Sequence, residues 1–182
     1  NNSGNISSNQ DLTITVSNSL NNSGNINSNN NLYLTSNNSF TNSGIINSLK
    51  DSKINFNSLN NSGEISALES LDLTGNSLTN SKKILANDTI AITINSLTNN
   101  ISGTIASLNN DVALTLSGDL ENNGEISAQD QLAITAGNIN NSGDIDSIND
   151  SAITASSLQN SGTILSNNKL TINSGVTTNN DD

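Results

Sequence analysis

Apolar residues recur at every second position within short runs, and the runs return about every twenty residues along the chain. The first unit illustrates the pattern, with Ile6 followed by the pair Leu12 and Ile14. A period of two places alternate side chains on one face of a β-strand and differs from the 3.6-residue period of a helix. Asn, Ser, Gly and Asp, which favour turns, separate the runs. The pattern predicts short strands with one buried face and one polar face.

A recurring phrase, SLNNSGNI at Ser19–Ile26 in its second occurrence, gives the units a common register. Counted between the glycines of this phrase, successive units are 20, 20, 19, 19, 21, 21, 19 and 19 residues apart. An isoleucine lies two residues after every anchor. Nine units therefore fill the chain, and we expect a single repeat domain over residues 1–182. The anchors are Gly4, Gly24, Gly44, Gly63, Lys82, Gly103, Gly124, Gly143 and Gly162.

A unit of this length is too small to fold alone. About five inward side chains provide on the order of 10 kcal/mol of burial, whereas ordering the backbone costs about 1–2 kcal/mol per residue. Stacked units bury a continuous column of isoleucines and complete one another's strand hydrogen bonds. The sequence therefore predicts an all-β fold, a parallel β-helix (solenoid) of about nine coils. A leucine-rich repeat has units of similar length, but its L-x-x-L-x-L-x-x-N string and its helical segment are missing here.

An asparagine lies two residues before the anchor in most units. In a stacked coil, identical amides can hydrogen-bond along the axis as a ladder. The exception is the junction TNNISG, which carries two extra residues. The phrase also spells the glycosylation signal N-x-S, but we interpret it as a corner, where Asn and Gly tolerate left-handed backbone. The expected ladder consists of Asn22, Asn42, Asn61, Asn80, Asn122, Asn141 and Asn160.

Lys82 is the one anchor that is not glycine. A lysine in left-handed backbone would be strained by about 1–2 kcal/mol. Either this corner is strained, or the anchor position is not left-handed.

Composition excludes several classes of partner. The net charge is -11, with sixteen acidic residues and only five lysines, whereas nucleic acid and anionic membranes attract basic surfaces. Apolar runs are too short for membrane insertion. The strict apolar rhythm argues against disorder, despite the low hydrophobicity. Because no charged and apolar leader precedes Asn1, we expect a segment of a longer protein.

The chain lacks His, Cys and Arg, so we expect no enzymatic activity, no catalytic residues and no cofactor. Glu125 and Asp144 occupy the same position in adjacent units, where they could share a hard cation such as Ca²⁺. The simpler interpretation is a solvated acidic face, and we assign no metal site.

Five residues form a weak candidate interaction surface. Lysines are concentrated in the third to fifth units, and Tyr33 is an aromatic residue on the outward face. The lysines could also pair with neighbouring acids across adjacent strands. The candidate residues are Tyr33, Lys50, Lys53, Lys82 and Lys83.

The repeats resemble a known family. Units such as GEISAQDQLAITAGNINNS are similar to the filamentous haemagglutinin-type repeat, roughly G-x-I-x-A-x-x-x-L-x-L-x-A-x-x-L-x-N-x-G. The resemblance covers nearly the whole chain, departing from the pattern at Lys82, Ser52, Ser151 and the insertion at Ile101. It implies a right-handed β-helix in a large exoprotein of a Gram-negative two-partner secretion system. It also implies export through an outer-membrane transporter and display on the bacterial cell surface.

These features favour a structural role. We expect a monomeric shaft segment that projects a distal functional tip, in an adhesin or a contact-dependent growth-inhibition protein. One alternative is an adhesive module that binds a receptor or glycan directly, and a second is a polysaccharide-active enzyme. The secretion, toxin and receptor-binding regions of the family are not visible in these repeats, so no functional residue is carried over.

Overall fold

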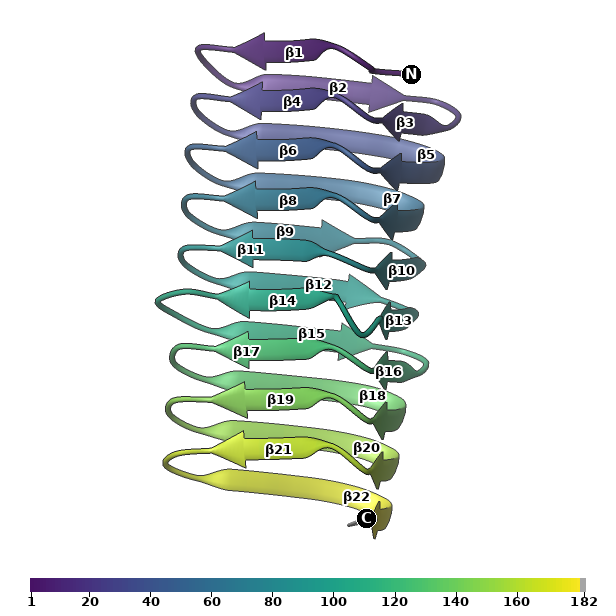
Figure 1. Cartoon of the computed structure of the whole chain (residues 1–182), viewed down its shortest axis with the longest axis vertical. Coiled ribbons are helices and arrows are strands. Elements are labelled where there is room, and N and C mark those ends of the chain that lie inside the picture. The colour runs from purple at the N-terminus through teal and green to yellow at the C-terminus, as the bar shows by residue number, and fades with distance from the viewer. Residues whose placement is uncertain (181–182) are drawn as a thin grey trace.

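The chain forms a rod of stacked coils, as the repeat spacing predicts (Figure 1). The computed structural model describes residues 1–180. Strands of the first sheet run leftward at the front of Figure 1, and the next strands run rightward behind them while the chain descends. This is a right-handed winding. Residues 1–180 form strands and turns, and none of them belongs to a helix that could cross a membrane.

Each coil starts with a four-residue strand that contains the isoleucine two residues after the anchor. These strands pair in parallel into a nine-stranded sheet, which confirms the nine predicted coils. The strands of this first sheet are β1 (Asn5–Ser8), β4 (Asn25–Ser28), β6 (Ile45–Ser48), β8 (Glu64–Ala67), β11 (Lys83–Ala86), β14 (Thr104–Ser107), β17 (Glu125–Ala128), β19 (Asp144–Ser147) and β21 (Thr163–Ser166).

The rest of each coil contributes to a second, thirteen-stranded sheet that bends around the core. In four coils the bend separates two strands, and in the other five one strand runs through it. The separate strands are β2 (Leu12–Val16), β3 (Leu20–Asn22), β9 (Leu71–Thr74), β10 (Ser77–Asn80), β12 (Ile90–Ile94), β13 (Ser96–Asn99), β15 (Val112–Leu116) and β16 (Leu120–Asn122). The continuous strands are β5 (Leu32–Asn42), β7 (Ser52–Asn61), β18 (Leu132–Asn141), β20 (Ser151–Asn160) and β22 (Leu170–Asn179).

The core consists of columns of equivalent residues. In the first sheet, Ile65 pairs in register with Ile46 of the preceding coil and Ile84 of the following coil, and all three side chains are fully buried. Inward residues of the second sheet also pair in register with their equivalents in neighbouring coils. The two sequence departures in these columns are also buried: Ser52 and Ser151 hydrogen-bond to Ser48 and Ser147 at 2.8 Å. Each irregular serine therefore has a hydroxyl partner within its own coil.

A further inward column, at the bend of the second sheet, was not predicted from the sequence. It includes the buried side chains of Phe56, Ile94 and Leu116. Gly75 lies beside Phe56, where an added Cβ would approach the phenyl ring to 2.4 Å. The absence of a side chain at Gly75 therefore makes room for the largest residue in this column.

The anchor glycines serve close packing and not left-handed backbone. Among residues 1–180, neither glycine nor any other residue has a positive φ, so the expected left-handed corner was wrong, and the second interpretation of Lys82 is confirmed. A Cβ at Gly44 would lie 2.0 Å from the carbonyl oxygen of Gly24 in the preceding coil. The corner at Lys82 has a different hydrogen bond. The N–H of Lys82 donates to Asn80 Oδ1 at 3.4 Å, whereas the N–H of Gly63 donates to the backbone carbonyl of Asn42.

This close approach predicts a position-dependent effect of alanine. Gly44→Ala should lower the free energy of unfolding by about 1–3 kcal/mol, because the new methyl group must push two coils apart. Gly4→Ala is the matched control, since a Cβ at Gly4 has nothing within 4 Å. Urea unfolding followed by circular dichroism measures both. Equal destabilisation by the two substitutions would contradict the packing explanation.

Candidate functional site

The most extended polar feature is a row of asparagines that runs the length of the rod and is buried from Asn2 to Asn141. The Nδ2 group of each donates to the Oδ1 atom of its equivalent in the following coil, at 2.7–2.9 Å. All the predicted members take part. The row contains Asn2, Asn22, Asn42, Asn61, Asn80, Asn99, Asn122, Asn141, Asn160 and Asn179.

Each amide also satisfies backbone groups at the corner. Asn61 is fully buried, accepts from Asn42 at 2.8 Å and donates to Asn80 at 2.9 Å. Its Nδ2 group is also 3.2 Å from the carbonyl of Gly63 and 3.1 Å from that of Lys83. Three acceptors thus share two N–H groups. One side chain therefore links the corner of its own coil to the next coil.

The row continues through the junction where the sequence predicted an interruption. Asn99 is buried, receives a hydrogen bond from Asn80 and donates one to Asn122, both at 2.9 Å. The two extra residues form a turn instead, in which Ile101 is 86% exposed. Counting back from Gly103 missed Asn99 because the insertion lies between them. Counting forward from Leu97, which pairs with Leu78, would have found it.

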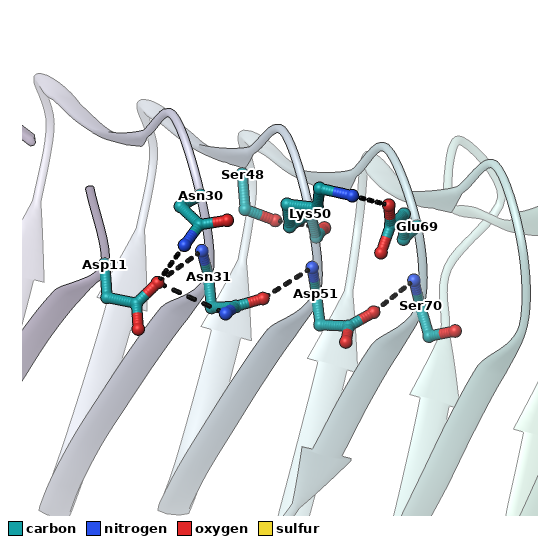
Figure 2. Close-up of polar contacts among 8 residues, drawn as sticks. All are labelled: Asp11, Asn30, Asn31, Ser48, Lys50, Asp51, Glu69 and Ser70. Carbon is teal, nitrogen blue, oxygen red and sulfur yellow. Dashed lines mark hydrogen bonds and ion pairs between the residues drawn. The ribbon is translucent and has the colours of Figure 1, made fainter. Parts of the chain in front are cut away.

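A second row of polar contacts joins the turns between the two sheets (Figure 2). Asp11 Oδ1 accepts from the backbone N–H of Asn31 at 3.1 Å, and Asn31 Oδ1 accepts from the N–H of Asp51 at 3.4 Å. Asp51 Oδ1 in turn accepts from the N–H of Ser70 at 3.0 Å. In each of these turns, a side-chain oxygen therefore accepts a hydrogen bond from a backbone N–H of the next coil.

Acidic residues elsewhere have the same role. Asp111 Oδ1 accepts from the N–H of Gln131 at 2.9 Å, and Asp119 Oδ1 accepts from the N–H of Asn138 at 3.0 Å. The N–H of Gln131 lies in a turn, and that of Asn138 lies at the bend of strand β18; in both cases the carboxylate supplies an acceptor from the preceding coil. Several acids that look scattered in the sequence are thus structural acceptors between coils.

The candidate interaction residues do not form one surface. Tyr33 and Lys53 are neighbours in register on the second sheet, beside Asp72. Lys50 lies in a turn and forms an ion pair with Glu69 of the next coil (Figure 2). The hydrogen bond and the charge of Glu69 raise the pKa of Lys50. Both groups are about half exposed, so this pair contributes little to stability.

Lys82 and Lys83 lie together at the corner that precedes the first sheet. With Ile45, Gly63 and Glu64 they line a shallow depression of about 410 Å³. Lys83 is next to Glu64 in register, which is one of the opposite-charge neighbours expected from the sequence. The depression combines two cations, one acid and one exposed apolar side chain.

Acidic residues gather on the outer face of the first sheet in the seventh and eighth coils. Glu125 and Asp144 are neighbours in register, as predicted. Burial first, and then the charges of Glu125 and Asp144, raise the pKa of Asp146. Within residues 1–180, no set of three or more acidic side chains is arranged to hold a metal ion. Ser127 instead donates to Glu125 at 3.1 Å.

Comparison with known families gives matches along the chain. A family model described as the haemagglutinin repeat matches residues 1–48, 37–124, 87–152 and 147–182. Neither the curated proteins nor the solved structures include a significant match. The matched segments overlap or adjoin from the first coil to the last.

The asparagine row predicts a large effect of removing one amide. Asn61→Ala should lower the free energy of unfolding by about 3 kcal/mol or more, because orphaned buried groups cost about 1–3 kcal/mol each. Asn60→Ala is the matched control, since Asn60 is exposed on the same strand. Urea unfolding of both variants measures the difference. A loss below 0.5 kcal/mol for Asn61→Ala would contradict an energetic role of the row.

Proposed function

Because the chain belongs to the haemagglutinin repeat family, we propose that it is a shaft segment of a secreted filament at a bacterial cell surface. In this proposal the coils hold a functional tip at a distance from the cell, in an adhesin or a contact-dependent growth-inhibition protein. Proteins with this repeat are typically secreted to the cell surface. The proposal assigns no catalytic step and no cofactor to the chain.

The observation that carries the proposal is the continuity of coil-to-coil contacts. Hydrogen bonds between asparagine amides link every coil from Asn2 to Asn179. The strands of the first sheet pair in the same order along the whole rod. Since each coil repeats the contacts of the one before, the rod lengthens by about 4.8 Å per coil without any change in design. Such a structure is suited to spanning distance.

The proposal also includes export of the chain and its presentation at the cell surface, and this part rests on family membership. We expect a dedicated outer-membrane transporter to export the unfolded chain, and the coils to stack outside the cell. The free energy for ordering comes from stacking, because an isolated coil buries too little apolar surface to fold. The transporter, the tip and any receptor or glycan are partners in this proposal.

One experiment separates a shaft from a directly adhesive module. Removing residues 64–103 deletes two coils and joins Gly63 to Thr104 in register, because Glu64 and Thr104 both start equivalent strands. A shaft segment should remain folded and become about 10 Å shorter in small-angle X-ray scattering. Deleting residues 64–93 removes one and a half coils and is the control, which should fail to unfold cooperatively.

The same proteins are then tested for binding to red blood cells, epithelial cells and a glycan array. Neither the intact chain nor the two-coil deletion should bind specifically, and neither should degrade polysaccharides. Specific binding by the intact chain that is lost in the deletion, which removes Lys82 and Lys83, would overturn the shaft proposal. Binding that is lost in Tyr33→Ala would do the same.

A further inference from the structure

A hollow opens on the outer face of the first sheet, over the fifth to eighth coils. Its volume is about 380 Å³, within the range of about 300–1,000 Å³ that is typical of ligand sites. Leu85, Leu108 and Ile148 are among its lining residues, and the last two are about half exposed. Ala106 lies between Leu85 and Ser127 in register and is only 6% exposed. The small outward residues Ala106 and Ser127 therefore leave a recess with both apolar and polar walls.

An acidic group without a donor lies in the same hollow. Asp146 Oδ1 is buried and has no hydrogen-bond partner among the described residues. Its neighbours in register are Ser127 and Leu165, but the Ser127 hydroxyl donates to Glu125 and leucine has no donor. A buried acceptor without a donor is costly. The surroundings of Asp146 thus lack the group that would stabilise its ionised form.

The charges around the hollow have one sign. Glu125 and Asp146 line it, and Asp144 lies beside Glu125 in register. On the outer row of the first sheet, Thr104 separates Glu125 from Lys83, the nearest lysine of that row. Residues 101–182 contain ten acids and one lysine, Lys169, so the field over this half of the chain attracts cations.

We infer that this hollow is a docking site for an arginine side chain of a partner polypeptide. The aliphatic stem packs on Leu85, Leu108 and Ile148, and the guanidinium donates to Asp146 and Glu125. Rotation about the Cβ–Cγ bond lets either oxygen of Asp146 accept. Apolar walls and two carboxylates favour arginine because its planar, weakly hydrated group offers five donors. Calcium is the poorer fit, because no three acidic side chains among the described residues are placed to share one ion.

The test uses the whole chain and an end-blocked peptide, Leu-Gly-Arg-Gly-Leu. Titration followed by NMR should shift the amide signals of Ala106, Ser127 and Asp146 more than those of other coils. Asp146→Asn should weaken binding at least tenfold, because truncating a paired charge removes its main contact. Leu108→Asn should weaken it as well. Asp146→Asn should not lower the melting temperature, since it removes a partly buried, unpaired charge.

Two controls distinguish a specific site from diffuse attraction. Asp72→Asn makes the same change of charge on the second sheet and should leave the affinity unchanged. A peptide with citrulline in place of arginine, which is neutral and of similar shape, should bind at least tenfold more weakly. Equal losses in Asp72→Asn and Asp146→Asn would overturn the proposal. So would equal binding of the citrulline peptide, or the same shifts on adding CaCl₂ alone.

This site goes beyond the shaft role and does not depend on it. A failed titration would remove the docking site and leave the two-coil deletion test untouched. A successful one would add a lateral contact to a rod whose length is set by its coils.

Discussion

Each buried asparagine amide in the rod is satisfied by the next copy of itself. An unpaired amide in the core would cost about 1–3 kcal/mol, so every coil needs a neighbour with the same residue at the same place. This requirement fixes the register between coils, and the isoleucine columns and strand ladders then superimpose. The junction between the fifth and sixth coils illustrates how strong this requirement is. The extra residues Ile101 and Ser102 form an exposed turn there, while Asn99 keeps its place in the row.

The same requirement limits which positions of the coil can differ from one repeat to the next. Inward positions are restricted, and where polar residues enter them, as at Ser52 and Ser151, each finds a hydroxyl partner. At the turns, asparagine and aspartate alternate freely, because both offer an oxygen to the N–H of the next coil, as Asp11, Asn31 and Asp51 do. Outward positions vary most, and differences between coils there form local recesses such as the hollow beside Ala106.

The sequence predicted the strands, the nine coils and most of the asparagine row, because these follow from a period of two and a repeat near twenty. Other features depend on contacts between coils that spacing does not reveal. Asn99 was missed because the insertion shifted the count from Gly103. The glycines were expected to adopt left-handed backbone, but they allow close approach to the carbonyl of the preceding coil. The recess at Ala106 depends on the sizes of Leu85, on the neighbouring strand, and Leu108, in the turn that follows its own strand.

Exchange of the asparagine side-chain amide protons with solvent tests the central claim most directly. If the row holds the coils together, the carboxamide protons of Asn42, Asn61 and Asn80 should exchange at least a hundredfold more slowly than those of exposed Asn60, measured by ¹⁵N NMR in deuterated buffer. Protection should be shared by the central coils, because each amide depends on both neighbours. Exchange of the buried amides at the rate of Asn60 would contradict this account of the fold.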